Sequence, residues 1–228
     1  NWVLVSEMQV DEVLNPLDAS DSEFYRKFSE LSDYNDLFLI LPNGAIFYTV
    51  TQEADYRTNI LSGNFQTSNL AKVIRKIGYK ALDIEQMHKQ VSFTDFAPYE
   101  PKGNVPAAFI AKGVKISNSL LDKTNQTSWT NLGSQLVVAL QLSDSTLNEV
   151  MLQRTGLGET GESYLVGPDL KLRTSTRYSN RNLASSLSGE VSLNGADTEP
   201  VRLALAGQSD TGLYQNYNGD WVLASFSP

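Results

Sequence analysis

Seven polar and aromatic residues in the first half of the chain could hold a small ligand. They are Tyr48, Tyr56, Arg57, Asn59, Phe93, Asp95 and Tyr99. An arginine can hold a carboxylate through two parallel hydrogen bonds, an aspartate can hold an amine, and aromatic rings can wall a pocket. The sequence therefore predicts a pocket for a small polar ligand, with Arg57 and Asp95 as its polar anchors. A second interpretation stays open, in which Tyr48 and Phe93 are core residues and Asp55 pairs with the arginine at the surface.

A glycine-rich segment could bind phosphate. It reads Gly156-Leu-Gly-Glu-Thr-Gly161 and matches the G-x-G-x-x-G pattern of dinucleotide-binding loops. That loop works when a strand precedes it and a helix follows, because the helix N-terminus then faces the pyrophosphate. Here a predicted helix precedes and a predicted strand follows, and Glu159 and Glu162 would repel phosphate. We interpret the segment as a structural turn with positive φ angles, and we expect no cofactor.

Other catalytic and metal-binding patterns are sparse. The sequence has one histidine and no cysteine, which excludes thiolate and histidine-rich metal sites. His88 falls in the polar stretch Asp83–Gln90, and no G-x-S-x-G nucleophile elbow is present, so we interpret His88 as a surface residue. The carboxylates do not follow the calcium-loop pattern. We expect no metal and no catalytic residue, and a hydrolase that uses carboxylates of the same cleft is the alternative.

The charge and hydropathy of the chain limit its partners. The 228 residues carry a formal net charge of −8, and the 18 lysines and arginines are scattered. Without a basic run to neutralise phosphates, nucleic-acid binding is not expected. No apolar stretch reaches the roughly 20 residues that a membrane-spanning helix needs, and no signal peptide is visible. Any membrane span of the parent protein would have to lie outside this sequence.

The elements that must position these residues begin with a predicted sheet in the first half. Alternating or continuous apolar runs predict strands, and apolar residues three and four apart predict helices. The expected elements are a helix over Asp21–Leu31, a hairpin of Leu37–Leu41 and Ala45–Val50 around Asn43-Gly44, a helix over Asn69–Ile77, and strands over Val91–Phe96, Ala107–Ile116 and Gln135–Leu142. Polar segments at Gln52–Thr67 and Ser117–Gly133 predict loops.

The second half repeats this pattern of helix, strands and loop. The expected elements are a helix over Asp144–Gln153, a strand pair of Ser163–Val166 and Lys171–Thr176, a polar loop over Ser179–Asp197, a helix over Pro200–Ala206, and a hairpin of Thr211–Tyr217 and Trp221–Phe226. Two antiparallel-sheet modules of about 100 residues each fit this length.

The two ends of the chain have the character of neighbouring strands. Asn1–Met8 and Asn218–Pro228 each contain a short apolar run that begins at a tryptophan. An unpaired apolar strand would expose both a sheet edge and apolar surface. We therefore expect Trp2–Ser6 to pair antiparallel with Trp221–Phe226, with Gln9–Leu17 leaving as a short helix or tail.

Several segments of the sequence resemble those of one protein family. They are Tyr34-Asn-Asp-Leu-Phe-Leu-Ile40 with Asn43-Gly44, Thr94-Asp-Phe-Ala-Pro-Tyr99, Pro106-Ala-Ala-Phe-Ile-Ala111, Gly156-Leu-Gly-Glu-Thr-Gly-Glu-Ser-Tyr-Leu-Val-Gly-Pro168 and Arg173-Thr-Ser-Thr-Arg177. In these phrases the chain resembles the double Cache domain, the PAS-like extracytoplasmic sensor of bacterial chemoreceptors, sensor histidine kinases and cyclic-dinucleotide enzymes. The phrases extend over most of the chain apart from the segment Ser117–Gly133.

The resemblance implies a fold and a domain organisation. The fold would be α+β, with two PAS-like modules that are each an antiparallel sheet with flanking helices, and without the long N-terminal helix that usually starts such a domain. A membrane-distal module at 18–143 would bind the ligand. A membrane-proximal module would comprise 144–228 plus 1–17, with its closing strand rearranged to the N-terminus of the chain.

The resemblance also implies a function. Such domains sense amino acids, organic acids or amines and are not enzymes. The amino-acid-binding version has Trp-Tyr soon after its arginine, whereas Thr58 and Asn59 follow Arg57 here. The chain would be the periplasmic or extracellular part of an inner-membrane chemoreceptor or sensor kinase, joined to the membrane through segments outside the sequence and able to form a homodimer in the full receptor. A module that only mediates dimerisation and binds no ligand is a further alternative.

Overall fold

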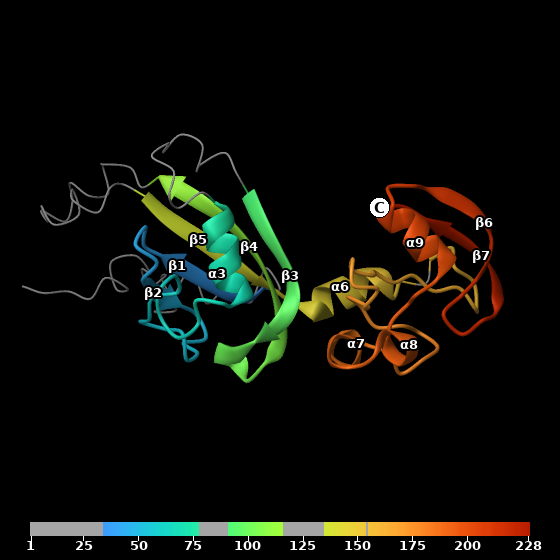
Figure 1. Cartoon of the computed structure of the whole chain (residues 1–228), viewed down its shortest axis with the longest axis horizontal. Helices are drawn as coiled ribbons and strands as arrows, with labels where there is room; N and C mark the ends of the chain where they lie inside the picture. Colours follow the sequence, from blue (N-terminus) through green and yellow to red (C-terminus); the bar gives the residue numbers. More distant parts are fainter. Residues whose placement is uncertain (1–33, 78–90, 116–134, 154) are drawn as a thin grey trace, which may run out of the picture. The chain divides into compact units, whose positions relative to one another are not determined.

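The computed structural model describes residues 34–77, 91–115, 135–153 and 155–228, and divides the chain into two compact units, Asn1–Ser143 and Asp144–Pro228 (Figure 1). Four predicted segments lie outside the described residues. They are the N-terminal segment Asn1–Leu17, the helix over Asp21–Leu31, the stretch Asp83–Gln90 with His88, and the loop Ser117–Gly133. The described residues form an α+β fold, as the sequence predicts.

The first unit contains one five-stranded antiparallel sheet. Its strands are β1 (Tyr34–Ile40), β2 (Ile46–Thr49), β3 (Val91–Tyr99), β4 (Val105–Lys115) and β5 (Gln135–Leu142). Their order across the sheet is β2-β1-β5-β4-β3, and every neighbouring pair is antiparallel. Each strand predicted in this half is present, with ends shifted by a few residues. The arrangement is consistent with a PAS-like fold at the coarse level.

Side-chain alternation gives the sheet two different faces. On β5, Val137 and Ala139 enter the main core, whereas Leu136 belongs to a second buried cluster. This is the period of two that a strand imposes on its side chains. The main core also holds residues from β1, β4 and the helix, including Phe38 and Phe109, whose rings pack edge to face with centroids 5.8 Å apart.

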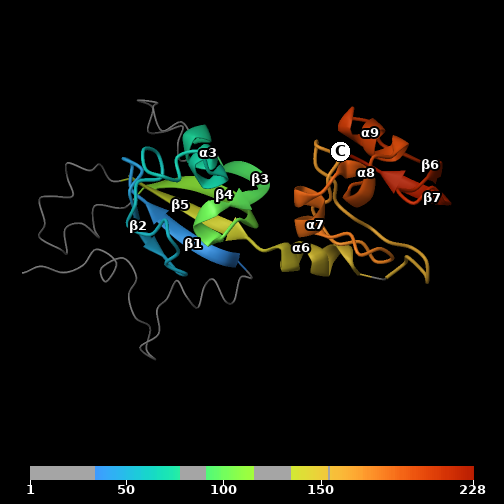
Figure 2. The ribbon, with the colours of Figure 1, turned by 60° about the horizontal axis from the view of Figure 1, so that its bottom comes forward.

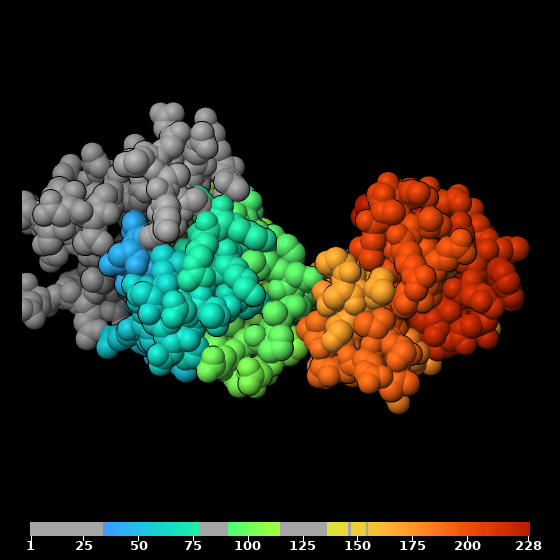
Figure 3. Space-filling view, in the orientation of Figure 1, coloured from blue at the N-terminus to red at the C-terminus, as the bar shows by residue number. Residues whose placement is uncertain are grey.

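Helix α3 (Asn69–Lys76) covers the main-core face of the sheet, where it contacts β3 and β4 (Figure 2). Leu70, Val73 and Ile74 are three and four residues apart and are fully buried, as expected for an amphipathic helix. The Ser68 side chain caps the N-terminus by accepting a hydrogen bond from the Ala71 amide. In the space-filling view the loop before α3 and α3 itself form one continuous surface over this face (Figure 3).

The second unit contains four helices and one hairpin among its described residues. They are α6 (Asp144–Met151), α7 (Leu183–Ser188), α8 (Val191–Asn194), α9 (Glu199–Leu205), β6 (Asp210–Gln215) and β7 (Trp221–Phe226). The predicted helices over Asp144–Gln153 and Pro200–Ala206 and the C-terminal hairpin are confirmed. The antiparallel pairing of β6 and β7 runs from Asp210 opposite Phe226 to Gln215 opposite Trp221.

Two predictions in the second unit are wrong. The segment Ser179–Asp197 is not a loop, since it contains α7 and α8. Asn182 and Ser185 form a capping box that starts α7 in a serine-rich sequence with weak helix propensity. The predicted strands Ser163–Val166 and Lys171–Thr176 are reduced to an isolated bridge between Val166 and Leu172.

The reason for the shortened strand pair is local. Backbone hydrogen bonds join Gly167 to Lys171 and Arg173 to Leu165, but the Leu165 amide donates to the Thr174 hydroxyl at 3.0 Å instead of to a backbone carbonyl. The ladder of backbone hydrogen bonds therefore stops at Leu165, next to the bridge.

Candidate functional site

Five polar side chains are buried on the main-core side of the first unit. They are Asp36, Asp55, Asn69, Tyr99 and Gln141, each at most 4% exposed, and together we call them the buried polar cluster. Polar groups are rarely buried to this extent unless their hydrogen bonds are made inside the protein. The cluster is therefore the feature of the unit that most needs a chemical explanation.

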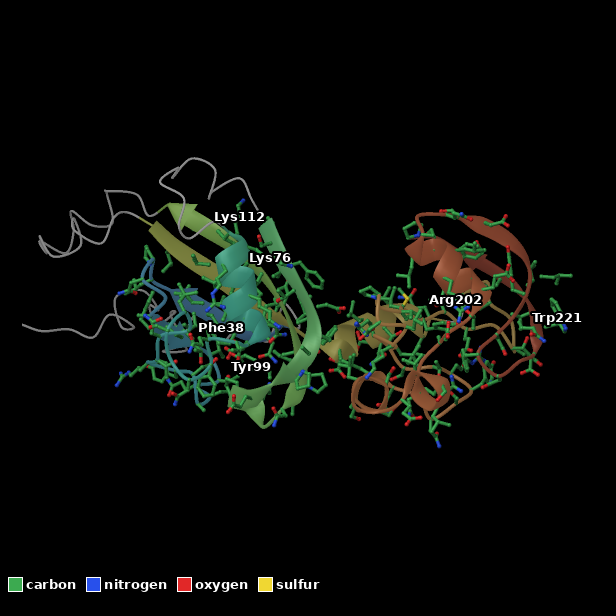
Figure 4. The ribbon with its side chains drawn as sticks, viewed as in Figure 1. Phe38, Lys76, Tyr99, Lys112, Arg202 and Trp221 are labelled. Atoms are coloured by element: carbon green, nitrogen blue, oxygen red, sulfur yellow. The ribbon has the colours of Figure 1, made fainter. Side chains whose placement is uncertain are left out.

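The sheet register places the strand members of the cluster on one face. Gln141 of β5 lies opposite Asp36 of β1 on one side and opposite Phe109 of β4 on the other. The ring of Tyr99 packs edge to face on Phe109 with centroids 4.9 Å apart. Because residues opposite each other on antiparallel strands share a face, Asp36, Gln141 and Phe109 lie in a row on one face, and Tyr99 packs at its Phe109 end. Figure 4 labels Phe38 and Tyr99 in this unit.

Asp36 is a buried carboxylate with a full set of donors. Its Oδ1 accepts from the amides of Leu37 and Val50 at 2.8 Å each and from the Thr51 amide at 3.3 Å. Its Oδ2 accepts from the Thr51 hydroxyl at 2.5 Å. Burial raises the pKa of Asp36, and these hydrogen bonds oppose the rise. The carboxylate fixes the end of β2 and the start of the following loop against β1.

Asp55 has an incomplete set of partners. The Tyr99 hydroxyl donates to its Oδ2. Burial raises the pKa of Asp55 to about 6, the Tyr99 hydrogen bond opposes the rise, and the negative charge of Asp36 adds to it. Burial and the Asp55 charge likewise raise the pKa of Tyr99, so the tyrosine stays protonated and acts as a donor.

Three atoms of the cluster have no hydrogen-bond partner among the described residues. They are Asp55 Oδ1, Asn69 Oδ1 and Gln141 Nε2. The Asn69 amide nitrogen does have partners, since it donates to the backbone carbonyls of Ala107 and of Asp95. A buried polar group without a partner costs about 1–3 kcal/mol. Two acceptors and one donor of the cluster are thus unsatisfied within the described residues.

Nearby basic side chains are bonded to backbone carbonyls or stacked on a ring. Arg75 donates to the carbonyls of Gln66 and Leu61. Lys76 donates to the carbonyl of Phe93 at 2.8 Å. The guanidinium of Arg57 lies 5.0 Å from the ring centroid of its neighbour Tyr56. None of these contacts joins a positive charge to Asp55 or Asp36.

Of the seven residues predicted from the sequence, Tyr99 lies in the buried polar cluster and Asp95 lies beside it. The backbone carbonyl of Asp95 accepts from Asn69, and its carboxylate accepts from the Phe96 amide at 2.7 Å. Tyr56 and Arg57 lie on the loop that carries Asp55, and the Arg57 side chain is exposed. Of the predicted set, Tyr99 therefore bonds Asp55 directly, whereas Tyr56 and Arg57 are its neighbours along the chain.

The other predicted residues lie elsewhere in the unit. A bulge in the pairing of β1 with β2 places Ile46 opposite Ile40 but Tyr48 opposite Leu39. Tyr48 consequently joins the second buried cluster, which also holds Leu37, Leu39 and Leu136. Phe93 is 48% exposed on the edge strand β3.

Asn59 has a bracing role in the turn between β1 and β2. Its Nδ2 donates to the carbonyl of Asn43 at 2.8 Å, and its Oδ1 accepts from the amides of Leu61 and Ser62. These bonds use its amide group within the loop. Asn59 thus supports the segment that leads from Asp55 to α3.

Four of the five members of the cluster are not among the residues predicted from the sequence, and one of them, Asp55, enters the sequence analysis only as a surface partner of Arg57. Gln141 carried a usable signal, because it has the same parity as Val137 and Ala139 in a strand whose alternate residues are buried. Two other members carried weaker signals. Asp36 is a carboxylate inside an apolar strand, and Asn69 is an amide at the first position of an apolar helix. Each is a polar residue at a position that the pattern assigns to the core.

The glycine-rich segment of the second unit is a turn, as predicted. Gly156 and Gly158 have φ values of 84° and 62°, and a Cβ at Gly161 would lie 2.2 Å from the Leu157 carbonyl oxygen. Helix α6 precedes the segment, and Glu162 beyond it accepts hydrogen bonds from the Tyr217 hydroxyl and the Arg177 amide. This geometry presents no helix N-terminus to a phosphate.

Searches for metal sites and membrane spans found none within the described residues. No group of three or more histidine, cysteine, aspartate or glutamate residues there could hold a metal ion. No described helix is both long and apolar enough to cross a bilayer. No protein family model, curated protein or solved structure matches this chain.

Proposed function

We propose that this chain is the extracytoplasmic ligand-sensing domain of a bacterial transmembrane signalling receptor, and that its first unit binds a small polar ligand at the buried polar cluster. The observation that carries the binding proposal is the set of three buried polar atoms without a described partner. The resemblance of the sequence phrases to double Cache domains supports the receptor part. A five-stranded antiparallel sheet with a helix on one face agrees with this class at the coarse level.

The position of the cluster suggests how binding would become a signal. Asp55 belongs to the loop before α3, Asn69 to α3 itself, and Gln141 to the central strand β5. A ligand that bonds all three would join the loop and the helix to the sheet. It would thereby shift the population of the unit towards the state in which these elements are held together.

The proposal is tested by thermal unfolding in the presence of amino acids, organic acids, amines and purines. We expect one class to raise the Tm saturably, since a ligand at 100 times its Kd stabilises the folded state by about 2.7 kcal/mol. Gln141→Leu should abolish the shift, and Gln215→Leu, the same change at an exposed position of β6, should not. The absence of a shift with every class, or a shift that survives Gln141→Leu, would contradict the proposal.

A competing hypothesis places the ligand at Arg57 and Asp95, the polar anchors predicted from the sequence. Arg57→Ala and Asp95→Ala should both weaken binding strongly if these side chains hold the ligand. If both variants keep the affinity while Gln141→Leu loses it, the buried polar cluster is the site and the sequence-based anchors are wrong.

A hydrolase is the second candidate, because Asp55 has a pKa near the range of a general acid or base. Product analysis after incubation with each stabilising compound separates the two functions. Turnover that disappears in Asp55→Asn would replace sensing by catalysis. A compound recovered unchanged supports sensing.

A further inference from the structure

We infer that the ligand of the buried polar cluster is a small organic cation, with an ammonium group bound by Asp55 and Asn69 and a hydrogen-bond acceptor bound by Gln141. This inference rests on the proposed function and names the chemical class of its ligand. It follows from the identity of the three unpartnered atoms and from the charges around them.

The three atoms belong to side chains that are linked by shared neighbours. Tyr99 bonds Asp55 and packs on Phe109, which lies directly opposite Gln141. Asn69 bonds the carbonyl of Ala107, which is two residues from Phe109 on β4 and so about 7 Å away along the strand. Asp55 and Asp36 also interact electrostatically. The loop, the helix and the sheet thus each contribute one unpartnered atom to the main-core side of the first unit.

The types of these atoms set the hydrogen bonds that the ligand must make. Asp55 Oδ1 and Asn69 Oδ1 are acceptors, so they require donors on the ligand. Gln141 Nε2 is a donor and requires an acceptor. An ammonium group supplies several N–H donors and no acceptor, which matches the two oxygens. A hydroxyl, carbonyl or ether oxygen at the other end of the ligand would accept from Gln141.

The surrounding charge selects a cation over a neutral donor or an anion. Asp36 and Asp55 are both fully buried, and Glu53 adds further negative potential. The side chains of Arg75 and Lys76 donate to backbone carbonyls rather than to these carboxylates. An anion would be buried beside two like charges, whereas an ammonium ion would compensate the cost of burying Asp55.

The test compares compounds that differ only in one end. For each length from two to four carbons, an ω-amino alcohol, the corresponding diol and the corresponding ω-hydroxy acid carry the same hydroxyl and an ammonium, hydroxyl or carboxylate head. Calorimetric titration at pH 8 should show binding of at least one amino alcohol, at least tenfold tighter than its diol, and no binding of its hydroxy acid. Preferred binding of the hydroxy acids, or no binding of any amino alcohol, would overturn the inference.

Two variants link the preference to the cluster. Asp55→Asn keeps the shape of the side chain but removes its charge, and should reduce the preference for amino alcohol over diol to less than threefold. Asp197→Asn removes a carboxylate that pairs with Arg202 in the second unit, and should leave the preference unchanged. A preference that persists in Asp55→Asn would contradict the inference.

The pH dependence gives an independent measurement. The ionisable groups that interact with Asp55 are Asp36 on β1, Glu53 on the loop and Tyr99 on β3. Affinity for an amino alcohol should rise as the pH increases through about 6 in the parent chain, because Asp55 then ionises. Asp55→Asn should flatten this rise.

The two levels of the proposal can fail separately. If an organic acid or a purine raises the Tm and Gln141→Leu abolishes the shift, the cluster still binds a ligand but the cationic class is wrong. If no compound of any class binds and Asp55→Asn folds with an unchanged or higher Tm at pH 8, the cluster is an internal polar network and both proposals fail.

Discussion

At the scale of single residues, the Asp55 carboxyl couples the stability of the first unit to pH. Its pKa is raised from the ordinary value of 3.8 to about 6, mainly by burial. Between these values the folded chain binds more protons than the unfolded chain. The contribution of Asp55 to stability is therefore fully present below about pH 4 and is lost as the pH rises towards and through 6. The loss attributable to Asp55 is on the order of 3 kcal/mol.

Asp55→Asn should remove most of this pH dependence. Urea unfolding of both chains at intervals from pH 4 to pH 8, without ligand, measures the difference in slope. Asp36 also has a raised pKa and adds a slope of the same sign, so the comparison with the parent chain is the decisive quantity. Asp197→Asn is the control, since the pKa of this exposed carboxyl is lowered by Arg202. Equal slopes in the parent chain and Asp55→Asn would refute the buried, unpaired state of the carboxylate.

Tyr99→Phe should destabilise the first unit in a pH-dependent way. The substitution keeps the ring contact with Phe109 but removes the donor to Asp55. We expect a loss of about 1–3 kcal/mol at pH 8, where the carboxylate is charged, and a smaller loss at pH 4. Tyr214→Phe removes an exposed hydrogen bond to Asp210 and should change the unfolding free energy by no more than about 0.5 kcal/mol at either pH.

The sequence pattern could indicate the surroundings of some predicted residues but not of others, and the reason is physical. Tyr99 could be selected because tyrosine is a common ligand-wall residue, and the structure places it in the cluster. Tyr48 could not be placed correctly, because the bulge between Leu39 and Ile40 changes the face to which it points. A one-residue irregularity of this kind leaves no clear mark in the hydrophobic pattern.

At the scale of elements, the turn between β1 and β2 constrains the loop that carries Asp55. Gly44 has a φ of 88°, and a Cβ there would lie 2.8 Å from Asn59 Oδ1 and from Leu61 Cγ. Gly103 also has a positive φ, but no atom lies within 4 Å of its Cβ position. Substitutions at these two glycines therefore distinguish the cost of backbone strain alone from the cost of strain with added steric overlap.

Gly44→Ala should be more destabilising than Gly103→Ala. Both substitutions place an alanine in the left-handed region, which costs roughly 1–2 kcal/mol. Only Gly44→Ala also displaces Asn59 and Leu61, which adds about 1 kcal/mol or more. Urea unfolding of the two variants measures the difference. A larger effect of Gly103→Ala would contradict the described packing of this turn.

The strands of the first unit were predictable because alternation and burial agree there. Gln135–Leu142 combines apolar residues on both faces, and it is the central strand β5. The second unit was less predictable, because α7 depends on a local side-chain cap and the pairing beyond the Val166–Leu172 bridge ends where the Leu165 amide bonds the Thr174 hydroxyl. A hydrophobic pattern reveals neither a side-chain cap nor a side-chain hydroxyl that takes the place of a backbone partner.

At the scale of the whole molecule, the hairpin of the second unit leaves an apolar face open. Leu213, Trp221 and Leu223 are 71%, 71% and 75% exposed, and Leu213 lies directly opposite Leu223. Figure 4 labels Trp221 on this hairpin. The two strands form a sheet of their own within the described residues. A two-stranded sheet with an exposed apolar face is marginal in water, and a further strand would stabilise it.

The predicted strand Trp2–Ser6, which lies outside the described residues, is the segment that we expect to pair with β7. Its sequence contains three consecutive apolar residues, Val3 to Val5, of the length and type that a closing strand requires. Because the chain has no cysteine, disulfide formation between two introduced cysteines reports their proximity without background. Three chains, each with Ser225→Cys on β7 and one cysteine at position 3, 4 or 5, therefore test the pairing.

We expect rapid oxidation of at least one of these three chains, since cysteines join when their Cα atoms are about 4.4–6.8 Å apart. The matched control places the fixed cysteine at Phe93, an exposed position on the edge strand β3 of the other sheet, and should show slow oxidation with all three partners. The oxidised chain should also unfold at a higher urea concentration than its reduced form, because the cross-link restricts the unfolded state. Preferential cross-linking to position 93, or equally slow oxidation of both series, would show that this segment does not complete the second sheet.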